Sequence, residues 1–164
     1  MRFNYCPACG SKLTLRRIDG DDRLACESPV CRFVHWNNPT PVVAALVQIN
    51  DVYILARNAA WPAGVFSLLT GFLEEGETPE SGVAREVVEE LGLEVRHVQF
   101  IGHFSFREHN QLIIAFACQA KGPLKLGDEV SETRRVPRDE LAGYDFGPLR
   151  LTREIVTRWL GVSR

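Results

Sequence analysis

The chain has 164 residues, of which 45% are hydrophobic and 24% are charged, and its net charge at pH 7 is −2. This length and composition predict one globular domain with room for a small appendage. The weak negative charge gives no reason to expect a general binder of nucleic acids or membrane surfaces. No apolar run is long enough to span a bilayer, and the first residues lack the apolar core of a signal peptide, so a cytoplasmic protein is expected.

Residues 1–36 form a distinct segment that holds four of the five cysteines and few apolar stretches. The cysteines fall in two close pairs, Cys6 with Cys9 and Cys26 with Cys31. In a reducing compartment such pairs favour metal over disulfides, and four thiolates suit a tetrahedral Zn²⁺. The segment is therefore predicted to be a zinc ribbon with a structural zinc ion. Two disulfides or four unrelated thiols are the alternatives, and His35 is in principle a replacement ligand.

A linker is expected at Asn37–Pro41, because two prolines restrict the backbone there. The predicted domains are thus a zinc ribbon over 1–36 and a second domain over 37–164.

Beyond the linker, the pattern of apolar and polar residues predicts both strands and helices. Strands are expected over 42–49, 52–56, 65–70, 95–101 and 112–117, with a polar loop over 105–111. Helices are expected over 79–91, 138–141 and 149–160. Because strands outnumber helices and their order is mixed, the predicted class is α+β, or an α/β/α sandwich with a mixed β-sheet.

The helix over 79–91 has clear boundary signals and an unusual charge pattern. Thr78 is a good N-cap, Pro79 suits the first helical position and Gly92 suits the C-terminal end. One face is expected to be apolar, made by Val83, Val87, Val88 and Leu91. The opposite face is expected to carry Glu86, Glu89 and Glu90.

Three carboxylates so close together repel one another unless a cation lies between them. Hard divalent cations with oxygen ligands, Mg²⁺ or Mn²⁺, suit this arrangement. A solvated acidic helix face is the alternative. Arg85 and Glu77 are suited to a salt bridge that ties the helix to the preceding loop, and the carbonyl of Gly71 is placed to reach the same metal.

The stretch from Gly71 to Leu93 carries fixed residues at a characteristic spacing: Gly71, Glu77, Arg85-Glu86-Val87, Glu89-Glu90 and Gly92-Leu93. This pattern resembles the Nudix box, and the resemblance to Nudix hydrolases covers roughly Pro41 to Leu160. It implies metal-dependent hydrolysis of the pyrophosphate bond in a nucleoside diphosphate linked to another group, which releases phosphate monoesters such as AMP. It also implies roles as metal ligands or water-orienting residues for Glu86, Glu89, Glu90 and the Gly71 carbonyl, with Arg85 and Glu77 as a structural pair.

In many Nudix proteins a glutamate outside the box completes the metal site. Glu129 is the first candidate here. Glu132 is the second candidate for this ligand, and it is also a candidate for contacting the substrate. Arg57 is the candidate for binding a phosphate, and Phe106 is the candidate for stacking on a base.

A zinc ribbon before a Nudix domain resembles the NADH pyrophosphatases, some of which remove NAD caps from RNA. It also resembles a group that hydrolyses FAD and ADP-ribose. Residues 66–74 are similar to the first group. The Pro- and Trp-rich stretch that NADH pyrophosphatases carry after the box is absent from residues 102–111. The substrate class is thus expected among NADH or NAD⁺, ADP-ribose and FAD.

A binding module that senses a nucleotide or ADP-ribose, with the ribbon contacting protein or RNA, is the main alternative to an enzyme. An intact set of glutamates favours the enzyme, since a sensor does not need them. The ribbon's basic residues are interspersed with acidic ones, which gives little support for binding NAD-capped RNA through this segment. Zinc-ribbon relatives often form dimers, so a homodimer is compatible with the resemblance.

Overall fold

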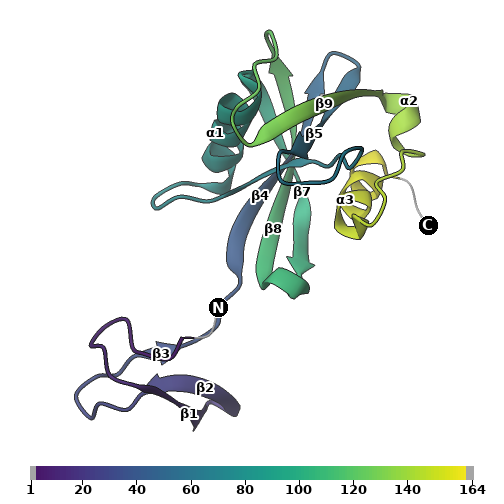
Figure 1. The fold of residues 1–164 in the computed structure, drawn as a ribbon. Coiled ribbons are helices and arrows are strands. Elements are labelled where there is room, and N and C mark those ends of the chain that lie inside the picture. The colour runs from purple at the N-terminus through teal and green to yellow at the C-terminus, as the bar shows by residue number, and fades with distance from the viewer. Residues whose placement is uncertain (1–2, 162–164) are drawn as a thin grey trace. The chain divides into compact units, whose positions relative to one another are not determined.

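The computed structural model describes residues 3–161. The chain forms two compact units that divide between Asn38 and Pro39 (Figure 1). Within the described residues, no helix has both the length and the apolar character that crossing a membrane requires.

The first unit is a three-stranded antiparallel sheet made of β1 (Leu13–Ile18), β2 (Asp21–Cys26) and β3 (Val34–His35), in the order β1-β2-β3. Its buried residues, among those the structure describes, are Cys6, Leu13, Ala25 and Cys26. So few buried side chains cannot offset the entropy lost on ordering the segment, and small units of this kind usually need a metal or a covalent cross-link.

The second unit is built on one six-stranded sheet. Its strands are β4 (Thr40–Ile49), β5 (Val52–Asn58), β6 (Leu69–Phe72), β7 (Glu94–Phe106), β8 (Gln111–Lys121) and β9 (Val130–Pro137). The order is β7-β8-β4-β5-β9, and β6 also pairs with β4. Because β4 and β8 run parallel and the other pairs run antiparallel, the sheet is mixed, as predicted.

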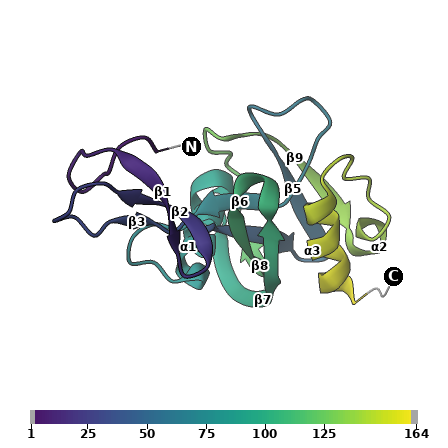
Figure 2. The same cartoon turned by 90° about the horizontal axis from the view of Figure 1, so that it is seen from below.

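Helices cover both faces of this sheet, α1 (Pro79–Leu91) on one and α3 (Arg150–Leu160) on the other, with the short α2 (Arg138–Leu141) beside α3 (Figures 1 and 2). Alternate residues of β4 enter the two cores: Ala44 packs toward α3 and Val43 toward α1. A strand that is buried on both faces has a continuous run of apolar residues in its sequence. Residues 42–49 form such a run, which explains why the sequence predicts a strand there. The predicted α/β/α sandwich is confirmed.

Two predicted segments differ from the structure. The strand expected over 65–70 is displaced, because residues 65–68 contribute only an isolated bridge between Ser67 and Ala56 and the strand β6 begins at Leu69. The loop expected over 105–111 is shorter, since β7 extends to Phe106 and a short 3₁₀ helix occupies Arg107–His109. Burial of the apolar residues in 65–68 comes from packing in the core rather than from a regular ladder.

The ends of α1 follow the predicted signals. Thr78 accepts a hydrogen bond from the Ser81 backbone amide, and the Ser81 side chain accepts one from Thr78, which completes a capping box. Gly92 ends the helix in the left-handed conformation, with φ of 65°.

The predicted faces of α1 are partly wrong. Val88 is 52% exposed, whereas Val83, Val87 and Leu91 are fully buried. At 100° per residue, Glu86 and Glu90 lie along one border of this buried stripe. Val88 lies beyond the opposite border, where the helix faces solvent. Two of the three glutamates are therefore drawn toward the sheet instead of into solvent.

Candidate active site

Arg85 is the centre of the charge network on α1. Its Nε donates to Oε1 of Glu77 at 2.7 Å and its Nη2 donates to Oε2 of Glu77 at 3.1 Å, so the two side chains form a bidentate pair. The same Nη2 donates to the Phe72 carbonyl at 3.0 Å. These hydrogen bonds from Arg85, joined by one from the Glu74 backbone amide, lower the pKa of Glu77 to about 2. The pair fastens α1 to the end of β6 and to the loop between them.

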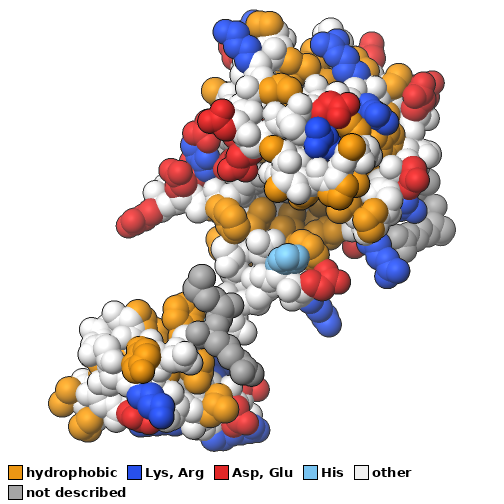
Figure 3. Space-filling view, viewed as in Figure 1, with side chains coloured by type: hydrophobic (Ala, Val, Ile, Leu, Met, Phe, Trp, Pro, Cys, Tyr) orange, Lys and Arg blue, Asp and Glu red, His pale blue; other side chains and the backbone are white. Residues whose placement is uncertain are grey.

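Arg85 also contacts two of the box glutamates. Its Nη1 lies 2.9 Å from Glu86 Oε1 and 2.8 Å from Glu89 Oε2. The guanidinium group therefore offsets part of the repulsion between the glutamate carboxylates. A bound cation is not the only positive charge beside them. Acidic side chains gather along α1 and the loop before it in the space-filling view (Figure 3).

The carboxylate of Glu86 lies directly against Gly71. A Cβ added to Gly71 would overlap this carboxylate. Gly71 sits opposite Val43 in the β6–β4 ladder, on the face of the sheet that α1 covers. Glycine is needed here because a larger residue would occupy the position of the Glu86 side-chain end. Burial raises the pKa of Glu86, and its contact with Arg85 opposes that rise.

Glu90 has a buried oxygen without a partner. Within the described part of the chain, its Oε2 makes no hydrogen bond. Burial raises the pKa of Glu90, and the charge of Glu129 raises it further, while a hydrogen bond from the Glu129 backbone partly offsets this. A buried unpaired carboxylate oxygen beside a second carboxylate is costly, so the site favours a cation or a proton.

The loop before β9 brings Glu129 to this position. The backbone amide of Gly127 donates to the Glu90 carbonyl at 3.0 Å, and that of Lys125 donates to Leu91 at 2.9 Å. A Cβ on Gly127 would lie 2.6 Å from the Glu89 carbonyl oxygen, so only glycine allows this approach. Glu129 then lines a cavity of about 30 Å³ together with Glu90.

The donor groups at this site match a hard divalent cation. Glu86, Glu90 and Glu129 supply carboxylate oxygens, and the unpaired Oε2 of Glu90 can act as a metal ligand without giving up a hydrogen bond. These oxygens are not yet gathered into a ligand cluster: among the described residues, the group of three or more side chains close enough to hold a metal ion is that of the four ribbon cysteines. Binding an ion would therefore bring these oxygens closer together than they lie here.

A larger pocket of about 810 Å³ adjoins the acidic site on the α3 side of the sheet. It is lined by apolar residues of β4, β8 and α3, by the segment Ser105–His109 and by Trp61. Trp61, Leu68 and Thr70 line both this pocket and the small cavity of Glu90 and Glu129. Figure 3 shows hydrophobic side chains gathered in a hollow above the β7–β8 turn. The volume is within the range of small-molecule sites.

The candidate substrate residues are placed differently. Phe106 lines the large pocket, and its ring lies 4.6 Å from that of His109. Arg57 instead donates to Glu132 at 3.3 Å and to the Trp61 carbonyl at 3.2 Å. Arg57 and Glu132 therefore support the loop that carries Trp61, and Glu132 lies within β9.

Several residues that shape the site and its pocket have no signal that was used in the sequence. Ser67 and Thr152 form a buried hydrogen bond of 2.7 Å between their hydroxyl groups, and both line the pocket. They lie 85 positions apart, so no local pattern links them. Gly127 was also missed, although a glycine just before Asp128-Glu129 was a usable signal for close approach to another backbone.

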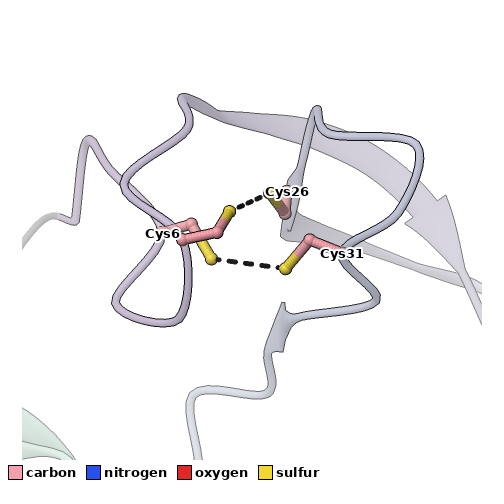
Figure 4. Close-up of side chains that lie close together, drawn as sticks. Cys6, Cys26 and Cys31 are labelled. Atoms are coloured by element: carbon pink, nitrogen blue, oxygen red, sulfur yellow. Dashed lines mark hydrogen bonds between the residues drawn. The ribbon is translucent and has the colours of Figure 1, made fainter.

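The four cysteines of the first unit lie together: Cys6 and Cys9 come from the segment before β1, and Cys26 and Cys31 from the end of β2 and the loop after it. Cys6, Cys26 and Cys31 are labelled in Figure 4. The Sγ atoms of Cys6 and Cys31 are 3.7 Å apart, and those of Cys9 and Cys26 are 3.4 Å apart. A disulfide needs about 2.05 Å, whereas thiolates about 2.3 Å from a tetrahedral Zn²⁺ lie about 3.8 Å apart. The cluster therefore suits zinc, and the disulfide alternative does not fit. Hydrogen bonds from Ser11 lower the pKa of Cys9 to about 6, which favours a thiolate.

Comparison with protein families gives two matches. Residues 38–160 match the NUDIX domain family, and residues 4–37 match the Nudix N-terminal family. Together they account for nearly the whole chain.

Named relatives and solved structures agree with these matches. The chain is 30% identical over 159 residues to the NAD-capped RNA hydrolase NudC of Stutzerimonas stutzeri, an alignment that covers 97% of this chain and 55% of that protein. It is 35% identical over 158 residues to the protein of the same name from Mycobacterium tuberculosis, covering 80% of this chain and 48% of that one. The chain thus spans about half the length of these relatives.

A crystal structure of a NUDIX hydrolase from Nitrosomonas europaea superposes with a TM-score of 0.81 at 26% identity, over 97% of this chain and 91% of that one. An ADP-ribose pyrophosphatase from Streptococcus suis, at 22% identity and a TM-score of 0.60, covers 77% of this chain and 93% of that one and shares the fold. With a family match over most of its length and the box glutamates on α1 beside β6, the chain belongs to the Nudix hydrolases.

Proposed function

We propose that the chain hydrolyses the pyrophosphate bond of a nucleoside diphosphate linked to a second group, with Mg²⁺ or Mn²⁺ held by Glu86, Glu90 and Glu129. The observation that carries this proposal is the unpaired buried oxygen of Glu90, which faces a second carboxylate at the edge of a nucleotide-sized pocket. The bound cation would neutralise the phosphate oxygens and lower the pKa of the attacking water. A P–O bond breaks as the water oxygen bonds to phosphorus, and two phosphate monoesters result.

The chain's own residues have separate tasks in this scheme. Glu86, Glu89, Glu90 and Glu129 would hold the cation or orient water, and the Gly71 carbonyl would be a further ligand. Arg85, fixed by Glu77, orients Glu86 and Glu89. Since relatives are named NAD-capped RNA hydrolases, the favoured substrates are NAD⁺, NADH or an NAD-capped RNA end.

A substrate panel tests the proposal. Phosphate monoester release from NADH, NAD⁺, ADP-ribose, FAD and diadenosine polyphosphates is measured with and without Mg²⁺. At least one is expected to be cleaved to AMP and a second monophosphate product, or to paired adenosine phosphates, only with the cation. Tight binding of a panel member without turnover of any would instead support a sensor module.

The zinc ribbon is proposed to occupy the first unit, followed by the hydrolase domain, with one structural zinc bound by the four cysteines. Chelation of zinc is expected to unfold the first unit, because the four buried residues described there make too small a core to fold alone. Limited proteolysis should then cut within residues 3–38 while Mg²⁺-dependent turnover continues.

Metal analysis provides the control for this prediction. The purified protein should contain one zinc per chain, Cys26→Ser should lose it, and Cys118→Ala should keep it because Cys118 lies in β8, outside the cluster. Protein purified without zinc would refute the ribbon assignment.

A further inference from the structure

Trp61 occupies a distinctive place in the hydrolase unit. It lines both the 810 Å³ pocket and the small cavity that holds Glu90 and Glu129. The side chain is half-buried, although its neighbours in the loop, Ala60 and Pro62, are exposed. The ring therefore stands where a ligand that fills the pocket would continue toward the glutamates.

The loop that carries Trp61 is fixed by hydrogen bonds at both the backbone amide and the backbone carbonyl of this residue. The Trp61 amide donates to the Asn58 carbonyl at 2.9 Å, and Arg57 donates to the Trp61 carbonyl at 3.2 Å. The Asn58 side chain accepts from the Ala60 amide at 2.9 Å. These bonds fix the backbone from which the indole projects, which lowers the entropy lost when the loop orders around a ligand.

The same loop is tied to the acidic site. The amide of Ala59 donates to the carbonyl of Glu129 at 2.8 Å. Glu132, on the strand that follows, pairs with Arg57. The position of Trp61 is thus coupled to the backbone of Glu129, so a base stacked on the indole would be set at a fixed place relative to the carboxylates.

The chemistry of the pocket favours a flat ring. Apolar side chains of β4, β8 and α3 contribute to its lining, and its aromatic side chains are Trp61, Phe106 and His109. Phe106 and His109 already pack on each other at 4.6 Å. Trp61 has no ring partner among the aromatic pairs of the described residues, and its half-buried side chain lines the pocket where a ligand would lie.

We propose that Trp61 binds the nucleobase of the substrate by stacking and thereby sets the position of the diphosphate against Glu90 and Glu129. This inference rests on the proposed function, since it assigns the nucleoside end of that substrate to the pocket. It makes Trp61 a specificity-determining residue for substrates with an aromatic base, and Arg57 a positioning residue that acts through it.

The binding test uses AMP and ribose 5-phosphate, which differ only by the base. The dissociation constant of each is measured by calorimetry with the wild type, Trp61→Phe, Trp61→Ala and Trp36→Phe. Stacking on an aromatic ring corresponds to about a tenfold change in affinity. AMP is expected to bind Trp61→Ala about tenfold more weakly, to bind Trp61→Phe nearly as well as the wild type, and to bind Trp36→Phe unchanged. Ribose 5-phosphate should bind the wild type and Trp61→Ala alike.

Fluorescence gives an independent signal for the same contact. AMP should quench the tryptophan emission of the wild type and of Trp36→Phe in a saturable manner, and Trp61→Phe should lose this quenching while still binding AMP. Equal AMP affinity in the wild type and Trp61→Ala, with both proteins equally folded by circular dichroism, would overturn the inference.

Kinetics separates this inference from the proposed function. For a dinucleotide that the wild type cleaves, Trp61→Ala should raise KM about tenfold and change kcat less. An unchanged KM with intact turnover would refute the role of Trp61 and leave the hydrolase assignment standing. Absence of wild-type turnover with base-dependent AMP binding would refute the hydrolase assignment alone.

Discussion

Glu90→Gln is expected to lower Mg²⁺-dependent turnover by at least about 100-fold, since it removes a charged ligand of the cation. The same change should raise the melting temperature of the metal-free protein by about 2–4 °C, which corresponds to about 1 kcal/mol in a chain of this size. The physical reason is that Glu90 has an unpaired buried oxygen and faces the charges of Glu129 and Asp128. Removing its charge relieves that repulsion. Calorimetric melting and steady-state turnover measure the two effects.

Glu80→Gln is the matched control, because Glu80 lies on the same helix but is exposed in its first turn. It should leave turnover near the wild-type level and not stabilise the protein. Wild-type turnover in Glu90→Gln, or a lower melting temperature of its metal-free form, would contradict the assignment of Glu90.

The stabilisation should depend on pH in a defined direction. The folded-state pKa of Glu90 lies above its ordinary value of 4.5, so the folded protein holds the proton more tightly than the unfolded chain. Stability from this group is therefore present below pH 4.5 and is lost as pH rises through the folded pKa. The advantage of Glu90→Gln over the wild type should grow with pH across that window. Glu77 behaves oppositely: its contribution is present above its ordinary pKa and is lost as pH falls through about 2.

Gly71→Ala is expected to reduce turnover by about 100-fold with little loss of stability. The added Cβ would take the place of the Glu86 carboxylate. Because that carboxylate is the far end of a flexible side chain, it can swing away without moving the backbone. The fold then survives, while a ligand is displaced by more than the roughly 1 Å that costs about 100-fold in rate. Alanine also reduces the freedom of the unfolded chain, which offsets strain in the strand.

Gly143→Ala is the control for this change. Gly143 has an ordinary φ, and its added Cβ would meet only the Glu140 carbonyl oxygen at 3.9 Å, so both turnover and stability should stay near the wild type. Full turnover in Gly71→Ala would show that the position of Glu86 does not matter for the reaction. Gross unfolding of Gly71→Ala by circular dichroism would contradict the expected flexibility of Glu86.

Local signals in the sequence were sufficient for much of the fold. Thr78, Pro79 and Gly92 marked the ends of α1 because capping and the left-handed C-terminal conformation depend on one or two residues. The doubly buried strand β4 was visible as one apolar run. The start of β6 was misjudged because Phe66 and Leu68 are buried by tertiary packing, which their sequence does not distinguish from a strand.

The site was less predictable than the fold. Dividing α1 into one apolar face and one acidic face was too coarse a description. It did not show that Glu86 and Glu90 lie beside the buried stripe, or that Val88 lies outside it. Arg85 was expected to pair with Glu77 but also contacts Glu86 and Glu89, which depends on side-chain direction. The pocket joins Trp61 to residues of α3, and such long-range proximity leaves no periodic signal.

The most direct test of a cation held by the box glutamates is a Mn²⁺ titration followed by electron paramagnetic resonance, with zinc-loaded protein. Wild type and Glu80→Gln should bind Mn²⁺ that Mg²⁺ displaces, and Glu90→Gln should bind it at least about tenfold more weakly. Mn²⁺ binding by Glu90→Gln with wild-type affinity would place the cation elsewhere and contradict the account.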